Sequence, residues 1–320
     1  MQISSVSRAS GRRATAAAAY RAGERLRDER SGELHNYSRR RDVAHAEIFL
    51  PSQFDGAAAW ARQRERLWNT AEHAEKRYHA RVAREYQLTL PAELDATQRL
   101  LLARSFSQEL AERYRVAVDL AVHEPRPGGD PRNFHAHLLT TTREVTPTGL
   151  GAKTGLDLTP RERRRRELPD HRSEYLTLRE RWATLTNEAL RAANLEARVD
   201  HRSLAAQGVS REPQPAIPLM HLKMEQRGVR SEVAERLRAA YRLRVQQREQ
   251  LEHSQATLSP VLSGDAAATT KLDVDTIRRQ AREAWLQMRT QERLQNTSQL
   301  SERTAREENN ELPRRDDLAL

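Results

Sequence analysis

The chain has 320 residues and a formal net charge of +10, from 55 lysines and arginines against 45 acidic residues, and only 37% of it is hydrophobic. This composition is lean for a fully packed chain, so we expect part of it to be exposed helix or disordered. The sequence has no cysteine, which excludes disulfides, cysteine-ligated zinc and a thiol nucleophile, and fits a reducing cytoplasm.

The positive charge is almost all arginine, which forks onto phosphate and stacks on bases. A polyanionic partner is therefore favoured, with nucleic acid as the first candidate and a cationic protein without a specific partner as the alternative. No segment approaches the ~20 apolar residues of a membrane span, and the N-terminus has no apolar signal core. We expect a soluble cytoplasmic protein without membrane insertion.

The first quarter of the chain predicts two helices around one strand. Residues 7–28 are rich in alanine and predict a helix that Ser7 or Ser10 could cap, because a short hydroxyl satisfies free backbone N–H groups. Residues 45–50 alternate in polarity and stop at a proline, as a strand does. Residues 55–82 predict a polar helix, whose inner face would carry Trp60, Leu67 and Trp68.

The middle of the chain predicts three strands and a helix. Residues 85–90, 115–123 and 134–142 alternate in polarity, and the short segment between the last two predicts that they pair as a hairpin. Residues 95–113 predict an amphipathic helix with Leu101, Leu102, Phe106 and Leu110 at helical spacing. Together these patterns predict an α+β fold, an antiparallel β-sheet with helices packed on one face.

The last half of the chain changes in composition. A loop over residues 147–172 would contain an arginine run, and a helix over 173–195 would point Tyr175, Leu178, Trp182, Leu185 and Leu190 inward. After a proline-rich stretch, residues 230–255 and 270–308 predict charged, exposed helices joined by a flexible linker. We therefore expect one domain over residues 1–212 and a helical, charged, partly flexible extension over 213–320.

Alternation along the predicted strands gathers three histidines. Side chains on a strand point to opposite faces in turn, so His123 shares a face with Asp119, while His135 and His137 share a face of the neighbouring strand. If the apolar faces are buried under helices, all three imidazoles emerge together on the open face. Glu85 and Gln87 of the third strand fall on that same face, opposite Tyr86, Leu88 and Leu90.

Three neutral imidazoles that leave coordination positions open are typical of a catalytic metal site rather than a structural one. The pattern therefore predicts that His123, His135 and His137 hold a metal ion. The alternative is a polar sheet face without metal.

The motifs of the chain resemble those of a known family. The segment from His123 to Asn133-Phe-His-Ala-His-Leu-Leu resembles the metal motif of His-hydrophobe-His relaxases and replication nucleases. Ser7-Arg-Ala-Ser-Gly-Arg, followed by Ala-Ala-Ala-Ala-Tyr20-Arg-Ala-Gly, resembles the nucleophile motif of the MobA/MobL (MobQ-class) plasmid mobilisation relaxases. The segments 45–51, 83–91 and 200–203 are also similar to that family, and the resemblance covers about residues 3–230.

The resemblance implies a relaxase-like two-layer sandwich and a site-specific, metal-dependent endonuclease and strand transferase. Tyr20 would attack one phosphodiester of single-stranded DNA at an origin of transfer, leaving a 5′-phosphotyrosyl bond that is later reversed to rejoin the strand. The three histidines would hold Mg²⁺ or Mn²⁺, and Glu85 would support a histidine or the ion. The family context implies relaxosome accessory proteins and type IV secretion coupling machinery as partners.

The nucleophile and the DNA surface require basic groups. A tyrosine hydroxyl has a pKa of about 10, so it needs help to lose its proton near neutral pH; the metal, Arg21 or Glu85 could supply it. Tyr37 and Tyr86 are rivals, although Tyr86 falls on the apolar face and is expected in the core. For DNA binding we expect the arginines around Tyr20, which are Arg8, Arg12, Arg13, Arg21 and Arg25. The arginine run at 161–166 is a second candidate.

Two other functions remain open. A rolling-circle replication initiator or transposase would use the same chemistry, but in those proteins the tyrosine follows the histidine pair, whereas Tyr20 precedes it. A catalytically decayed relative would bind DNA without cutting it.

The family usually begins with a longer apolar strand than the few residues before Ser7. The chain shows no GxxxxGK[ST] phosphate loop, so we expect it to nick DNA without unwinding it.

Overall fold

The computed structural model describes residues 1–54 and 56–263. The chain divides between Arg211 and Glu212 into two compact units, which are described separately.

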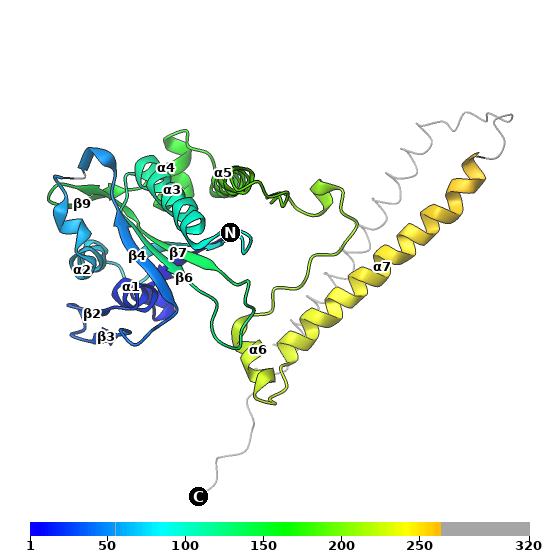
Figure 1. Cartoon of the computed structure of the whole chain (residues 1–320), viewed down its shortest axis with the longest axis horizontal. Helices are drawn as coiled ribbons and strands as arrows, with labels where there is room; N and C mark the ends of the chain where they lie inside the picture. The colour runs from blue at the N-terminus through cyan, green and yellow to red at the C-terminus, as the bar shows by residue number, and fades with distance from the viewer. Residues whose placement is uncertain (55, 264–320) are drawn as a thin grey trace, which may run out of the picture. The chain divides into compact units, whose positions relative to one another are not determined.

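The first unit is built on a five-stranded antiparallel sheet (Figure 1). Its strands lie in the order β1-β5-β7-β6-β4, with every neighbouring pair antiparallel. The predicted α+β class and the hairpin of the last two strands are confirmed. The strand bounds are β1 Gln2–Ser7, β5 Arg81–Thr89, β7 His135–Thr141, β6 Val118–His123 and β4 Val43–Phe49.

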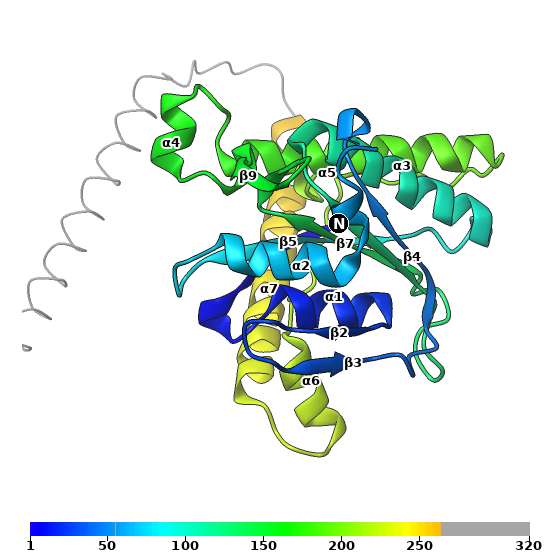
Figure 2. The ribbon, with the colours of Figure 1, turned by 90° about the vertical axis from the view of Figure 1, so that its left-hand side faces the viewer.

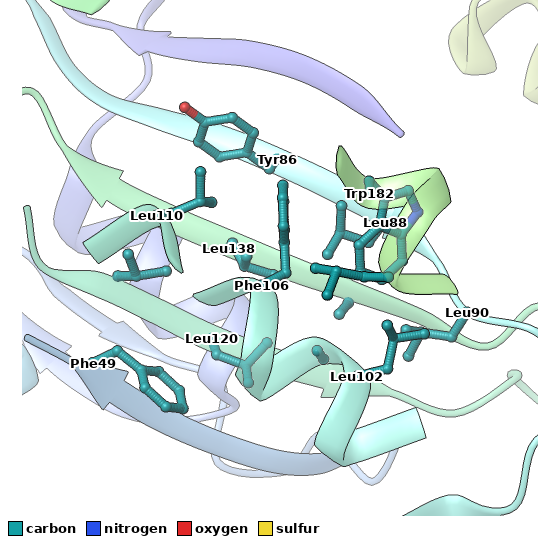
Figure 3. Close-up of a cluster of buried hydrophobic side chains, with 14 of the residues drawn as sticks. Phe49, Tyr86, Leu88, Leu90, Leu102, Phe106, Leu110, Leu120, Leu138 and Trp182 are labelled. Atoms are coloured by element: carbon teal, nitrogen blue, oxygen red, sulfur yellow. The ribbon is translucent and has the colours of Figure 1, made fainter. Parts of the chain in front are cut away.

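Two helices cover one face of this sheet, α3 (Ala96–Tyr114) and α5 (His171–Ala192). Figure 3 shows Phe106 and Leu102 of α3 and Trp182 of α5 meeting the apolar side chains of the strands. Asp95 caps α3, accepting from the backbone N–H of Gln98 at 2.8 Å, as the sequence favours. One detail was wrong: Leu101 is 56% exposed, because it lies outside the stripe that faces the sheet.

The opposite face is also partly covered, which the sequence did not predict. Figures 1 and 2 show α1 (Ala14–Ala22) and α2 (Arg64–Ala74) on the side of the sheet away from α3 and α5. Alanine side chains of α1 are fully buried in a second apolar cluster with Leu67 and Trp68, since small residues allow close packing. Helices α1 and α2 therefore cover part of the sheet face that carries the histidines, and the rest of that face is open.

The predicted helix over residues 7–28 is wrong in its extent. Ser7 ends strand β1, residues Arg8–Ser10 form a 3₁₀ turn, and α1 spans only Ala14–Ala22. Gly23 follows its last residue in a left-handed conformation with φ of 67°, and Gly11, with φ of 68°, ends the preceding 3₁₀ turn. No serine caps α1; instead Glu72 of α2 accepts from the backbone N–H of Ala14 at 2.7 Å. The remainder forms a hairpin of β2 (Arg25–Arg27) and β3 (Leu34–Asn36).

Two further predictions are corrected. The helix expected over 55–82 is a 3₁₀ turn (Ala59–Arg62) followed by α2, and the chain has entered β5 by Arg81. Its expected inner residues Trp60, Leu67 and Trp68 are buried, as predicted. The loop expected over 147–172 contains regular structure: β9 Gly149–Lys153, which pairs with β8 (Arg143–Thr146) just before the loop, a 3₁₀ turn Gly155–Asp157 and α4 Pro160–Arg165. Further 3₁₀ turns lie at Ser52–Phe54 and Ala205–Gln207.

The described part of the second unit contains two helices, α6 (Leu219–Gln226) and α7 (Glu232–Ser263). Arg238 of α7 pairs with Glu225 of α6 at 2.6 Å. The helix expected over 230–255 is confirmed, whereas the one expected over 270–308 and its linker lie outside the described residues. Within residues 1–54 and 56–263, no helix is long and apolar enough to cross a membrane.

Candidate metal and tyrosine site

The β6–β7 hairpin brings the three histidines together on one face. In its register His123 lies opposite His135, and Ala121 lies opposite His137, so alternation places all three imidazoles on the same side. One nitrogen from each ring lies within 4.8 Å of the others, and the ring centroids are 4.9 to 5.2 Å apart. This spacing suits three ligands of a single ion.

Hydrogen bonds fix the orientation of two of these rings. Nδ1 of His135 lies 2.9 Å from the carbonyl oxygen of Asn133, and Nδ1 of His137 lies 2.7 Å from a carboxylate oxygen of Glu85. Both oxygens only accept, so each Nδ1 carries a proton and Nε2 is the ring nitrogen left to face an ion. An outer partner that orients the ring in this way is the usual arrangement around a histidine-bound metal.

Glu85 is the central acid of the site. Its side chain is buried on β5 and accepts from Arg21 Nε at 2.6 Å as well as from His137. Burial alone would raise the pKa of Glu85, but hydrogen bonds from His137 and Arg21, and the charge of Arg21, lower it to about 2. The carboxylate is therefore ionised, and it orients both an imidazole and a guanidinium.

His123 joins the sheet to helix α1. Its Nε2 lies 2.8 Å from the backbone carbonyl of Arg21, and its Nδ1 lies 3.4 Å from Arg40 Nη2. Burial lowers the pKa of His123 to about 4, although the hydrogen bond to the Arg21 carbonyl acts in the opposite direction. A neutral imidazole is the form that binds metals.

Tyr20 lies at the rim of the site, at the end of α1. It is 39% exposed, and its hydroxyl accepts from Arg126 Nη2 at 2.9 Å. Arg40 lies 4.1 Å from the centre of its ring, and Tyr37 packs edge-on at 5.2 Å. The hydrogen bond from Arg126 lowers the pKa of Tyr20 despite partial burial, because it stabilises the phenolate.

Tyr20 and His137, one of the three histidines, line one cleft. A cavity of about 590 Å³ is lined by Tyr20, Arg21, Glu85, Gln87 and His137 together. Its walls come from α1, β5 and β7, which are far apart in the sequence. A phenol, a carboxylate, a guanidinium and an imidazole thus line a common cavity.

Comparison with known proteins identifies this arrangement. The model of the MobA/MobL family matches residues 12–227, which include Tyr20, Glu85 and the three histidines. The chain belongs to the MobA/MobL family.

Named relatives of this MobA/MobL chain come from several bacteria. It is 36% identical over 274 residues to mobilization protein MobL of Acidithiobacillus ferridurans, covering 78% of this chain and 68% of that protein. It is 30% identical to conjugal transfer protein TraA of Rhizobium radiobacter over 71% of this chain. The matched region spans only 22% of that TraA, and only 42% of the probable mobilization protein MobA of Bifidobacterium longum.

One solved structure is similar in both fold and sequence. It is described as "Molecular Basis of Vancomycin Resistance Transfer in Staphylococcus aureus" and superposes with a TM-score of 0.53 and 30% identity. The match covers 63% of this MobA/MobL chain and 97% of that one.

The structure distinguishes among the arginines expected at the DNA surface of this MobA/MobL chain. The Arg8 side chain is 8% exposed, pairs with Glu72 at 2.9 Å and donates to backbone carbonyls at the end of α2, so it has a structural role, and its expected DNA contact stays a prediction. Arg21 is held by Glu85. Arg12 and Arg13 line the cleft, while Arg25 is exposed on β2 outside it.

Sequence reasoning missed Arg40 and Arg126, the two arginines that contact Tyr20. Both pair with Asp42, which thereby ties the 124–133 loop to the segment before β4. The only signal for Arg126 was the presence of arginines in the loop before His135. The sequence does not show which loop arginine contacts Tyr20.

Proposed function

We propose that this chain is a conjugative relaxase that nicks one strand at a plasmid origin of transfer and later rejoins it. Family membership and relatives named for mobilisation and conjugal transfer support this proposal. The observation that carries it is the shared cleft of Tyr20, Glu85 and His137. Tyr20 is the nucleophile in this proposal, and the strand is single-stranded DNA.

The histidine cluster fits a divalent ion. One nitrogen from each of the three imidazoles lies within 4.8 Å of the others, and an ionised carboxylate lies behind His137, so the group forms a suitable ligand set for Mg²⁺ or Mn²⁺. When bound, such an ion supplies positive charge that offsets the negative charge of the scissile phosphate. His123, His135 and His137 would hold it, and Glu85 would keep His137 in the correct tautomer.

The protein itself prepares the tyrosine. Arg126 donates to the Tyr20 hydroxyl and favours the phenolate, whose proton can leave to solvent because the ring is partly exposed. The phenolate oxygen attacks phosphorus, the bond from phosphorus to the 3′-side oxygen breaks, and that oxygen takes up a proton. The phosphotyrosyl ester bond replaces the broken bond to phosphorus one for one. The reverse attack by the 3′-hydroxyl therefore rejoins the strand.

The experiment incubates the full chain with Mg²⁺ or Mn²⁺ and a supercoiled plasmid carrying its transfer origin. We expect protein covalently attached to a 5′ end with the wild type and none with Tyr20→Phe, which retains DNA binding. Tyr37→Phe is the matched control, because Tyr37 packs against the same ring but would keep the adduct. An adduct in Tyr20→Phe assigns the nucleophile elsewhere, and binding without any cleavage in the wild type leaves the decayed, DNA-binding alternative.

Relaxosome accessory proteins and secretion coupling machinery are proposed as partners of the whole protein. Support for them comes from the names of the relatives, and the charged helices of the second unit are the region to test for such contacts.

A further inference from the structure

Three consecutive arginines precede β4, and only the middle one points into the site. Arg39 and Arg41 are exposed, and among the described residues neither forms an ion pair. The side chain of Arg40 is only 12% exposed and pairs with Asp42. A cation leaves water only where other groups replace its hydrogen bonds, so the position of Arg40 depends on the contacts that it makes in the site.

The guanidinium of Arg40 makes several contacts at once. Its Nη1 donates to the backbone carbonyl of Tyr20 at 2.5 Å, and its Nε donates to Asp42 Oδ1 at 2.8 Å. Its Nη2 donates to the other Asp42 oxygen and lies 3.4 Å from Nδ1 of His123. Its central carbon lies 4.1 Å from the centre of the Tyr20 ring. One rigid, planar group therefore joins the main chain and the ring of Tyr20 to a histidine of the cluster.

The backbone around Arg40 is shaped to approach the end of α1. The backbone N–H of Arg40 donates to the carbonyl of Tyr37 at 3.0 Å, which closes a turn. A Cβ atom on Gly23, which follows α1, would lie 3.1 Å from a methyl group of Val43 and 3.7 Å from Cβ of Arg40. The missing side chain of Gly23 therefore allows the segment with Arg40 to pack closely beside Tyr20.

Arg40 and Arg126 contact different parts of the tyrosine. The Arg126 side chain is 60% exposed and donates to the Tyr20 hydroxyl, whereas Arg40 contacts the carbonyl and the face of the ring. The pKa of Tyr20 is lowered chiefly by the hydrogen bond from Arg126 and less by the charge of Arg40. Arg40 is therefore placed to hold the tyrosine more than to ionise it.

We propose that Arg40 is a positioning residue that fixes the phenol of Tyr20 beside the histidine cluster. The proposal rests on the proposed function, because Tyr20 must meet a phosphate next to the histidines. Packing alone does not fix the Tyr20 ring, which is 39% exposed, whereas a guanidinium that is stacked on it and hydrogen-bonded to its main chain does. A catalytic group that is displaced by about 1 Å can lose on the order of 100-fold in rate.

The test measures adduct formation by the full-length protein on a single-stranded oligonucleotide that spans the mapped nick, at saturating DNA and Mn²⁺. Arg40→Lys keeps the charge but loses the planar fork, so we expect a rate roughly 10- to 100-fold below that of the wild type. The affinities for DNA and Mn²⁺ should stay within about threefold of the wild type, because Arg40 acts on the step after binding. Arg39→Lys is the matched control, since it changes the exposed neighbour in the same way, and it should keep the wild-type rate.

Other results would overturn the proposal. A wild-type rate in Arg40→Lys would show that only the charge of Arg40 matters. A loss of DNA or Mn²⁺ affinity that matches the loss of rate would show a general structural role. Arg40→Ala removes both the charge and the fork and should be at least as slow as Arg40→Lys, so a faster rate would contradict the need for the fork.

A second measurement tests the position of the ring without DNA, metal or chemistry. With 3-fluorotyrosine in place of Tyr20, we expect the ¹⁹F resonance of the protein to differ from that of free 3-fluorotyrosine, because a guanidinium lies on the ring. Arg40→Lys should move the resonance toward the free value, and Arg39→Lys should leave it unchanged. An unchanged resonance in Arg40→Lys would disprove the positioning role, whereas a wild type that forms no adduct would disprove only the proposed function.

Discussion

At the scale of single residues, the site is a set of charges that hold one another in place. Asp42 pairs with Arg40 and Arg126, and these two contact the ring and the hydroxyl of Tyr20. The pKa of Asp42 lies well below its usual range, chiefly because of the hydrogen bond from Arg40. Two positive charges therefore lie beside the tyrosine, and the single carboxylate of Asp42 holds both in position.

Arg126→Ala should shift the pH dependence of nicking. The phenolate is the reactive form, and the hydrogen bond from Arg126 lowers the pKa of Tyr20, so its loss raises that pKa. The rising limb of the rate against pH then moves to higher pH, and the rate near neutral pH falls by roughly threefold to tenfold, a modest effect because the pair is solvent-exposed. The measurement is the initial rate of adduct formation between pH 6 and pH 10.

Arg132→Ala provides the control for that profile. Arg132 lies in the same loop and pairs with Asp130, so its replacement removes the same charge without touching the phenol. A profile for Arg126→Ala that coincides with that of Arg132→Ala would contradict the assigned role.

Glu85→Gln should weaken metal binding. The amide oxygen of glutamine can still accept from His137 Nδ1, but the side chain has lost its charge and its NH₂ cannot accept from Arg21, so His137 is held less firmly in its metal-binding orientation. Loss of such an outer partner typically lowers affinity about 10- to 100-fold. Calorimetric titration with Mn²⁺ measures it, with Glu109→Gln, an exposed acid on α3, as the control; equal affinities in the two variants would disprove the role.

At the scale of elements, two apolar clusters on opposite faces of the sheet hold the hairpin that carries the imidazoles. Leu120 and Leu138 point toward α3 and α5, while Leu139 and Ala117 point toward the helices on the other side. Rigid strands place the three rings more accurately than loops would.

Substitutions on the buried and exposed sides of α3 should differ in their effect on the free energy of unfolding. Phe106 is fully buried against Trp182, so Phe106→Ala should lower the free energy of unfolding by about 3 to 5 kcal/mol through lost packing and the cavity left behind. Leu101→Ala, an exposed position of the same helix, should change it by less than about 0.5 kcal/mol. Urea denaturation followed by circular dichroism gives both values, and similar losses at the two positions would contradict the packing described.

At the scale of the whole molecule, every residue of the proposed site lies in the first unit, Met1–Arg211. That unit contains the complete sheet and both apolar clusters. The second unit contributes charged helices that pair among themselves, as Arg238 does with Glu225.

A fragment of residues 1–211 should therefore fold and bind metal by itself. A unit with its own core behaves as an independent domain, so we expect one cooperative thermal transition and Mn²⁺ affinity within about twofold of the full chain. Thermal denaturation and calorimetric titration of both proteins make the comparison. A fragment that is unfolded, or that has lost the metal, would show that residues 212–320 are part of the functional domain.

The sequence by itself determined four of the five strands of the sheet and the meeting of the histidines; it missed β1, whose last residue Ser7 was expected in a helix. Period-2 alternation is a local property of the chain, and a short connection leaves adjacent strands little choice of partner, so His123, His135 and His137 could be placed on one face. The same logic placed Glu85 with them and Tyr86 in the core.

Only the tertiary structure decided where the alanine-rich segment becomes helical and which arginines serve the tyrosine. The limits of α1 depend on Gly23, in a left-handed conformation at its C-terminal end, and on Glu72, a capping group from another helix at its N-terminal end. Arg126 reaches Tyr20 and Arg8 is enclosed by α2 because of contacts between residues distant in sequence. Long, flexible cations find their partners by proximity in space, and no local pattern records that choice.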